Sequence, residues 1–299
     1  MSSTIAVLGP GGVGGFVAAA LARAGEDVVV VAREPTAEAL AGDGIEVRSV
    51  LLGDFTAGPG AVASLREPPE VLIVATKATG LCESLARIEA PPGLVVPLLN
   101  GLDHVQLLRG HFGAQRVAAG TIRIESDRPA PGLIVHTSPF LRIDLAADDP
   151  GLHPALERLA ARLRGAEIPV QIGSSEAQIL WSKLVRLNAL ACTTSAVDRP
   201  IGFIRADPEW RPALVACLEE ATAVANADGA RVTAAGALAE RDQAHAELGS
   251  SMQRDIAAGR EPELDAIPGA VLRAAARHGL ACPTIERLVS VIAERVGVG

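Results

Sequence analysis

Residues 4–14 read TIAVLGPGGVG, and this stretch decides the fold that we expect. An apolar, β-branched run is followed by a G-x-G-x-x-G pattern, and residues 16–24 behind it are rich in alanine and leucine, as a helix would be. Residues 28–32 form a second apolar run of strand length. A strand, a glycine turn, a helix and a second strand make up a dinucleotide-binding unit, and this context makes the otherwise weak glycine pattern specific.

The glycines of the turn have expected roles. Gly9 permits the tight turn, and Gly11 lets the backbone approach a pyrophosphate. Gly14 allows the helix to pack closely on the strand, and Gly12 in the same loop is assigned to the cofactor site with them. The N-terminus of the helix would face the negative charge of the ligand. We therefore predict a dinucleotide fold, with a glycine turn of structural role alone as the alternative.

The end of the second strand bears on the choice of cofactor. An acidic residue there would accept a hydrogen bond from a ribose 2′-hydroxyl, whereas an arginine would pair with a 2′-phosphate. Arg33 occupies this place and favours NADP(H). Glu34 follows directly and keeps NAD as the alternative, because a rotated loop could present it instead.

The first part of the chain continues with short apolar runs of strand length. Near-continuous apolar strands separated by helices indicate a parallel sheet that is buried on both faces. Three later runs alternate with period two and predict an antiparallel hairpin added to that sheet. The apolar runs are residues 45–50, 71–75 and 95–99, and the alternating runs are 116–125, 133–137 and 141–145.

From about residue 174 the patterns are helical alone, and a capping-box pattern at Ser175 and Gln178 opens the first helix. We therefore expect an α/β Rossmann-type dinucleotide-binding domain over residues 1–172, followed by an all-α domain over residues 173–299. The expected helices cover residues 175–196, 208–228, 233–248, 263–279 and 283–296.

Composition excludes several classes of protein. The chain has 299 residues, 49% of them hydrophobic, and a formal net charge of −8, which argues against nucleic acid or an anionic membrane as a partner. No apolar run approaches the roughly 20 residues of a membrane helix, and the start Met1-Ser2-Ser3-Thr4 has no signal-peptide pattern. The four cysteines are widely spaced, so we expect packed, reduced thiols, no metal site and a cytoplasmic location.

Lysine is rare in this chain. Of 27 basic residues, Lys77 and Lys183 are the two lysines. An ammonium is compact and can exchange a proton near neutral pH, which a guanidinium cannot do. These positions therefore either need a lysine for their chemistry or merely survived a strong bias towards arginine.

Motifs spread over nearly the whole chain resemble those of the ketopantoate reductases (2-dehydropantoate 2-reductases). The pattern SSM-x-x-D-I, followed seven residues later by E-x-D, is the most specific of them. The motifs are IAVLG at 5–9 with its glycine loop, TKA at 76–78, NG at 100–101, GT at 120–121, LWSKL at 180–184, SSMQRDI at 250–256, ELD at 263–265 and HGLACP at 278–283.

The resemblance implies NADPH-dependent reduction of a 2-keto acid, with the active site between the two domains. By the resemblance, Lys183 is the general acid, and Glu263 is its acidic partner, which contacts the substrate hydroxyl. Ser251 matches the serine that holds the substrate carboxylate. Asn100 matches an asparagine near the nicotinamide and the substrate, and Lys77 a lysine that reaches the cofactor. A nearby ammonium would stabilise and neutralise the charge that develops on oxygen during hydride addition.

The chain departs from the family pattern on the helix of the general acid. Family asparagines at four and eight residues after the lysine are replaced by Leu187 and Ala191. Asn188 is near in sequence but lies about 100° around the helix from the family position. Thr194 returns to the face of Lys183 and matches the family. Part of the polar substrate pocket is therefore expected to be apolar.

Two further features carry expectations. Pro268 falls at the edge of the first turn of a helix that starts near Glu263, and it is expected to distort that helix. His136, His245 and His278 have no partner spacing that suggests catalysis or a metal site.

The expected function is reduction of 2-dehydropantoate to pantoate with NADP(H), in coenzyme A biosynthesis. The first alternative is the same chemistry on a more apolar 2-keto acid, and the second is a non-catalytic NADP-binding sensor. The expected partner is a small-molecule 2-keto acid, and a homodimer is compatible with the helical domain.

Overall fold

The computed structural model describes residues 3–297, which form two compact units. The first unit comprises the chain up to Leu99 and His104–Ile179, and the second comprises Asn100–Asp103 and the chain from Leu180 onward. Met1 and Ser2, part of the stretch without a signal-peptide pattern, lie outside the described residues. Within residues 3–297, no helix has the length and apolar character needed to cross a membrane.

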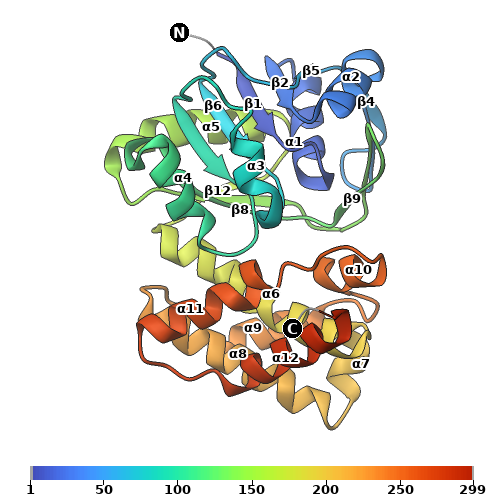
Figure 1. Cartoon of the computed structure of the whole chain (residues 1–299), viewed down its shortest axis with the longest axis vertical. Coiled ribbons are helices and arrows are strands. Elements are labelled where there is room, and N and C mark those ends of the chain that lie inside the picture. The colour runs from blue at the N-terminus through green and yellow to red at the C-terminus, as the bar shows by residue number, and fades with distance from the viewer. Residues whose placement is uncertain (1–2, 298–299) are drawn as a thin grey trace. The chain divides into compact units, whose positions relative to one another are not determined.

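The first unit is built on a five-stranded parallel sheet with the strand order β5-β2-β1-β6-β7 (Figure 1). Val7 in the central strand pairs with Val30 on one side and with Ile73 on the other. The expected parallel sheet is confirmed, and its central strands are buried throughout. The strands are β1 (Ile5–Leu8), β2 (Val28–Val31), β5 (Gly60–Val62), β6 (Val71–Val74) and β7 (Leu94–Pro97).

A second sheet, with the order β4-β3-β10-β9, packs against the helix α1 (Gly12–Arg23) that follows the glycine turn. The expected hairpin joins β9 and β10, but it belongs to this sheet, so the prediction that it extends the parallel sheet is wrong. The strand β3 also lies here, paired in parallel with β10. The strands are β3 (Ile45–Ser49), β4 (Phe55–Ala57), β9 (Ser126–Ala130) and β10 (Leu133–His136).

The physical reason for this difference is visible along β3. Ile45 and Val47 are buried, whereas Glu46 and Arg48 between them are exposed. Such alternation is typical of a sheet with one solvated face, whereas strands of a parallel sheet are apolar on both faces. Residues 45–49 therefore suit the second sheet.

A third sheet, with the order β12-β11-β8, completes the first unit. Val117, two residues before β8, forms a parallel bridge with Val95 of β7. Its strands are β8 (Ala119–Arg123), β11 (Arg142–Ala146) and β12 (Val170–Ile172). The other helices of the unit are α2 (Glu34–Asp43), α3 (Leu81–Leu85), α4 (His104–Phe112) and α5 (His153–Gly165), with 3₁₀ turns at Ala78–Gly80, Ala114–Arg116 and Pro150–Leu152.

The second unit is helical (Figure 1). The long helix α6 begins at Glu176, and the Ser175 hydroxyl accepts a hydrogen bond from the Gln178 amide at 3.1 Å, as the capping-box pattern predicts. The expected helix over residues 233–248 ends at Gln243, and two short helices were not predicted. The helices are α6 (Glu176–Val197), α7 (Ile201–Ala206), α8 (Trp210–Ala227), α9 (Ala234–Gln243), α10 (Ser251–Ala257), α11 (Ala270–Arg277) and α12 (Pro283–Val296).

All four cysteines are free thiols. Cys192, Cys217 and Cys282 are buried in the helical unit, but Cys82 is exposed, so the expectation of packing is wrong for Cys82. Burial raises the pKa of Cys282 to about 11, and nearby acidic groups add to the effect. At neutral pH Cys282 is therefore a protonated, unreactive thiol.

Candidate functional site

The glycine turn of the first unit connects β1 to α1. Gly9 has φ +92°, a conformation that side chains other than glycine rarely adopt, and its amide donates to the Val31 carbonyl at 3.1 Å. The Gly11 amide donates to the Gly9 carbonyl at 2.9 Å, which closes the turn. The first residues of α1 therefore present their backbone amides at the carboxyl end of β1, a natural site for an anion.

A methyl group placed on each glycine separates their roles. On Gly11 it would meet no atom within 4 Å, so the space beside this residue is open to a ligand. On Gly14 it would lie 2.1 Å from the Gly9 carbonyl oxygen, so Gly14 is required for the packing of α1 on the turn. The geometry of the turn fits a bound pyrophosphate at Gly11.

Gly12 has a steric reason of its own. A methyl group there would lie 2.3 Å from the carbonyl oxygen of Ser126 in β9. The Ser126 hydroxyl also donates to the Gly12 carbonyl at 2.9 Å. The second sheet thus contacts the glycine turn through Ser126, and the glycine pattern in the sequence did not indicate this contact.

Arg33 and Lys77 follow neighbouring strands of the parallel sheet. Arg33 lies after β2 as the N-terminal flanking residue of α2, and Lys77 lies after β6 before a 3₁₀ turn. Both residues are exposed. Because β2 and β6 flank β1, these two cationic residues and the glycine turn share the carboxyl edge at the point where the strand order reverses.

Thr76, just before Lys77, belongs to the TKA motif, and the sequence predicted no role for it. Its hydroxyl oxygen is buried and makes no hydrogen bond within the described residues. Its methyl carbon would lie 2.8 Å from a Cβ atom placed on Gly9. Thr76 therefore fixes the space beside the turn.

The second unit brings together two residues that lie 163 positions apart in the chain. The side-chain amide of Asn100 donates to Glu263 Oε2 at 2.9 Å. Glu263 is 6% exposed, so this carboxylate is largely removed from bulk water. A buried carboxylate needs such donors, because an unpaired one would be costly.

Glu263 directly precedes an irregular turn of helix. The Gly269 amide donates to the Leu264 carbonyl at 2.9 Å, and the turn Asp265–Gly269 is a π-helix with Pro268 inside it. Proline has no amide hydrogen and cannot continue the regular ladder. The expected distortion at Pro268 is therefore present, and it takes the form of a wider turn.

Lys183 lies on α6 and is half-buried. Leu187, one turn later, is also half-buried, and Ala191 is fully buried. Thr194 is buried too, and its hydroxyl pairs with that of Ser250 at 2.9 Å. The face of α6 that carries Lys183 is thus apolar at the two positions where the resemblance expects asparagines.

Asn188 belongs to a different environment on α6. Its side chain is buried and contacts two thiols, accepting from Cys192 at 3.5 Å and donating to Cys217 at 3.8 Å. It therefore serves the helical core and does not replace the family asparagines.

Ser251 and its neighbour Ser250 have different environments at the start of α10. The Ser250 hydroxyl caps the helix, accepting from the Gln253 amide at 3.0 Å, and also pairs with Thr194. Ser251 is half-buried in the first turn. The sequence motif pointed to Ser251 and did not indicate that Ser250 caps α10 or pairs with α6.

A buried tryptophan fixes α6 close to Lys183. The Trp181 indole donates to Asp228 Oδ2 at 2.9 Å, and His278 contacts Asp228 Oδ1 at 2.8 Å. Burial of Asp228 opposes its ionisation, but the hydrogen bonds from His278 and Trp181 outweigh burial and lower the pKa of Asp228. His278 is thus part of a structural cluster that orients α6.

Within residues 3–297, no group of three histidine, cysteine or acidic side chains is placed to hold a metal ion. The fold and these residues define a class of protein with two parts. An α/β unit of the dinucleotide-binding type is followed by a helical unit that contains the buried Glu263 carboxylate and carries Lys183 on α6.

Comparison with known proteins gives the family. The profile of the family described as Ketopantoate reductase PanE/ApbA matches residues 5–147, and that of its C-terminal part, PanE/ApbA C terminal, matches residues 177–296. Together the two matches cover most of the chain. The protein belongs to the ketopantoate reductase family, and it is an oxidoreductase of the 2-dehydropantoate 2-reductase type that uses a nicotinamide dinucleotide.

Individual relatives match this chain over nearly its full length. The 2-dehydropantoate 2-reductase of Mycobacterium tuberculosis (strain ATCC 25618 / H37Rv) is 32% identical, covering 98% of each chain. The crystal structure of 2-dehydropantoate 2-reductase from Geobacter metallireducens GS-15 has a TM-score of 0.89 at 29% identity, covering 97% of this chain and 99% of that one. The ternary structure of D-mandelate dehydrogenase with NADH and anilino(oxo)acetate shares the fold, with a TM-score of 0.88 at 17% identity over 98% of each chain.

Proposed function

We propose that this protein reduces 2-dehydropantoate to pantoate with NADPH, in pantothenate biosynthesis in the cytoplasm. The observation that carries the proposal is the hydrogen bond between Asn100 and Glu263. The resemblance assigns both residues to one site, although 163 positions separate them in the chain. Family membership supports the reaction class, and the names of the full-length relatives support the substrate.

In the proposed reaction, NADPH held at the glycine turn would supply the hydride that adds to the carbonyl carbon of the 2-keto acid. The Lys183 ammonium donates a hydrogen bond to the carbonyl oxygen and then transfers its proton, so that a C–H and an O–H bond form as the C=O double bond becomes single. Stabilising the developing oxyanion and protonating it are the steps for which a positioned acid is effective.

The other proposed residues bind and orient. Glu263 accepts a hydrogen bond from the substrate hydroxyl, and the Asn100 amide, which donates to its Oε2, holds the carboxylate in place. Asn100 is assigned to the nicotinamide and the substrate, and Ser251 to the substrate carboxylate. Lys77 is assigned to the cofactor, as the resemblance implies.

NADPH is preferred to NADH in this proposal because of Arg33. Its guanidinium is exposed at the end of β2, where a 2′-phosphate would lie in a fold of this class. The glycine turn formed by Gly9, Gly11, Gly12 and Gly14 would hold the pyrophosphate.

A second candidate is the same reaction on a more apolar 2-keto acid. The specific observation that favours it is the apolar face of α6, where Leu187 and Ala191 stand one and two turns after Lys183. A polar group of the substrate that lost its partner there would cost roughly 1–3 kcal/mol of binding free energy.

The test is the oxidation of NADPH with 2-dehydropantoate, beside a panel of branched apolar 2-keto acids. Turnover of 2-dehydropantoate supports the first candidate, and turnover of the apolar acids alone supports the second. Leu187→Asn sharpens the distinction, because it should improve the use of 2-dehydropantoate relative to apolar acids. NADPH binding without turnover of any acid would contradict both candidates and favour a sensor.

Lys183→Ala tests the general acid. We expect the turnover number to fall by about a hundredfold or more, the range for loss of a positioned acid, while NADPH still binds. Lys183→Arg is the matched control, because it keeps the charge but cannot give up a proton. Unchanged turnover in Lys183→Ala would remove Lys183 from this role.

We also propose that the active protein is a homodimer. Light scattering coupled to size-exclusion chromatography measures its mass directly, and a monomer that retains full turnover would contradict this.

A further inference from the structure

The loop Asn100–Asp103 is attached to the segment around Glu263 at three points. The first is the hydrogen bond from Asn100 to Glu263. The second is a close approach at Gly101, which has φ +90° and where a side chain would lie 2.1 Å from the Ala266 carbonyl oxygen. The third is an ion pair between Asp103 and Arg273 of α11.

Arg273 uses three nitrogens to connect the two segments. Its Nε donates to Asp103 Oδ2 at 3.0 Å, and its Nη2 donates to the same oxygen at 2.5 Å. Its Nη1 donates to Asp265 Oδ1 at 2.5 Å, and Nη2 also donates to the Asp265 carbonyl at 2.8 Å. One planar guanidinium thus joins the loop to the π-turn, which a single ammonium could not do in this geometry.

The π-turn has a physical need for such support. Pro268 removes an amide donor, and the turn leaves the regular hydrogen-bond ladder directly after Glu263. The Glu263 carboxylate itself accepts from Asn100, which lies in the loop and not in this turn. Burial of Arg273 opposes its charge, but hydrogen bonds to Asp103 and Asp265 outweigh burial and raise the pKa of Arg273.

We propose that Arg273 and Asp103 form a positioning pair that holds the Asn100 amide against the Glu263 carboxylate and so sets the orientation of the catalytic carboxylate. This inference rests on the proposed function for its effect on turnover. In the structure Arg273 binds Asp103 and Asp265, and it acts on the site through the loop and the π-turn.

Asp103 is the cleaner position for a test. It is half-exposed, lies three residues after Asn100, and contributes its carboxylate to Arg273. We expect Asp103→Ala to lower kcat about tenfold, since small misplacements of site residues have large effects on rate. Asp103→Glu restores the charge and should recover most of the loss.

A double-mutant cycle distinguishes positioning from general support. If Asp103 acts through Asn100, then Asp103→Ala in an Asn100→Ala background should cause little further loss of kcat. Losses that multiply in the double variant, or an unchanged kcat in Asp103→Ala, would overturn the inference. Asp242→Ala is the matched control, because it breaks the exposed ion pair with Arg211 in the same unit without touching this loop.

Hydrogen exchange measured by mass spectrometry tests the same pair without any turnover. Asp103→Ala should raise amide exchange in Asn100–Asp103 and in Asp265–Gly269, whereas Asp242→Ala should not. Unchanged exchange in both segments would overturn the inference. A wild-type protein that reduces no 2-keto acid, but shows this exchange response, would contradict the proposed function and leave the positioning contact standing.

Discussion

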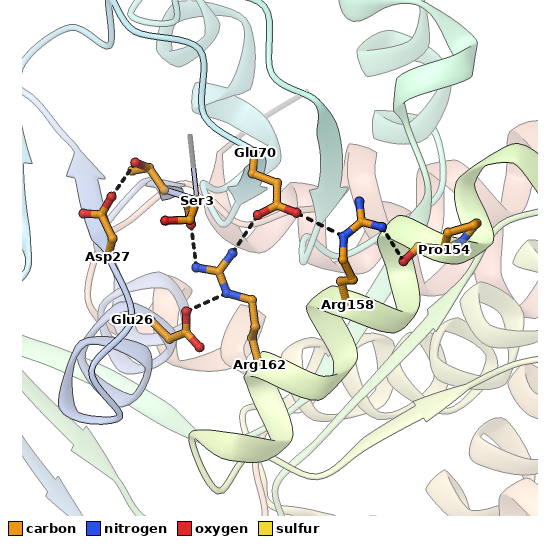
Figure 2. Close-up of polar contacts among 8 residues, drawn as sticks. Ser3, Glu26, Asp27, Glu70, Pro154, Arg158 and Arg162 are labelled. Atoms are coloured by element: carbon orange, nitrogen blue, oxygen red, sulfur yellow. Dashed lines mark hydrogen bonds and ion pairs between the residues drawn. The ribbon is translucent and has the colours of Figure 1, made fainter. Parts of the chain in front are cut away.

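The two edges of the five-stranded sheet use polar residues in opposite ways. At the carboxyl edge, the glycine turn leaves open space at Gly11, and the charges of Arg33 and Lys77 lie exposed after neighbouring strands. At the amino edge, charged side chains bind one another and the ends of the strands (Figure 2). The carboxyl edge thus offers space and positive charge to a ligand, whereas the charged groups at the amino edge form hydrogen bonds within the chain.

One side chain closes much of the amino edge. Arg162 of α5 donates to Glu26 at 2.6 Å, to Glu70 at 3.1 Å and to the Ser3 carbonyl at 2.6 Å (Figure 2). These partners lie just before β2, β6 and β1, which are three neighbouring strands. Arg158, one turn earlier on α5, shares Glu70 at 3.2 Å. The comparison predicts that changes at one edge affect ligand binding and changes at the other affect stability.

The largest expected effect is at Gly11. Gly11→Ala fits the backbone, which has φ −76°, and meets no protein atom, so the free energy of unfolding should not fall. The added methyl group would occupy the space of the pyrophosphate and should weaken NADPH binding by about a hundredfold, within the cost of an overpacked contact. Titration calorimetry with NADPH measures this.

Gly12→Ala is the matched control for Gly11→Ala. Its methyl group would overlap the Ser126 carbonyl oxygen, so it should lower the melting temperature. If Gly11→Ala binds NADPH as the wild type does, the open space at Gly11 does not hold the cofactor.

The next effect in size is at Arg162. Arg162→Ala should lower the free energy of unfolding by about 2 kcal/mol, because it removes the ion pair with Glu26 and leaves Glu70 paired with the exposed Arg158 alone. Binding of NADPH should stay unchanged, since the carboxyl edge is not touched. Denaturation with urea measures the stability.

Arg158→Ala is the control for Arg162→Ala. The Arg158 side chain is 60% exposed, against 16% for Arg162, so water screens its pair with Glu70. Its loss should cost about 0.5 kcal/mol. Equal losses in the two variants would mean that burial does not decide the strength of this network.

A smaller effect is expected for cofactor choice. Arg33→Ala should weaken NADPH binding by about tenfold, the loss of one charge-assisted contact to a phosphate, and should leave NADH nearly unaffected. The ratio of the two dissociation constants is the measurement. An equal effect on both cofactors would mean that another residue binds the 2′-phosphate.

The smallest effect concerns pH and the sheet behind the turn. His136 is buried beside Phe16 of α1, with Ser49 Oγ at 2.8 Å from its Nδ1 and Ser138 Oγ at 3.1 Å from its Nε2. Ser138 donates to the Phe140 carbonyl, so it accepts from His136, and the neutral ring accepts from Ser49. The neutral form of the imidazole is thus the one that this network fits.

Burial lowers the pKa of His136 below its ordinary value, although nearby hydrogen bonds and Glu125 oppose the shift. The stability from the neutral ring is complete above about pH 6.5 and is lost as the pH falls through the folded pKa. In His136→Gln, the free energy of unfolding should fall less steeply as the pH drops below 6.5. The change in slope should be smaller than the limit for uptake of one full proton, which is about 1.4 kcal/mol per pH unit. A slope identical to that of the wild type would contradict this assignment.

Parts of the fold were predictable because their causes are local. The apolar runs of β1, β2, β6 and β7 and the pattern of Gly9 to Gly14 predict the parallel sheet and its turn. The alternation of Glu46 and Arg48 with buried neighbours was also readable, and it indicates a half-solvated sheet rather than the parallel one. The distortion at Pro268 follows from the missing amide hydrogen alone.

The candidate site was predictable only where motifs carried it. The sequence motifs indicated Asn100 and Glu263 separately, but their hydrogen bond depends on how a loop and a π-turn pack. The support from Arg273 and Asp103 had no signal in the sequence, because neither residue stands in a distinctive local pattern. The same holds for Ser126 behind Gly12.

The sequence by itself determined the alternation of strands and helices, the glycine turn and the helix that carries Lys183. These follow from hydrophobic periodicity and backbone preference, which act over a few residues. The tertiary structure alone decided that β3 pairs with β4 and β10, that Arg162 binds residues just before three strands, and that Asn100 donates to Glu263. Such contacts join residues far apart in the chain, and they form only because burial of the whole core outweighs the conformational entropy lost in closing the intervening chain.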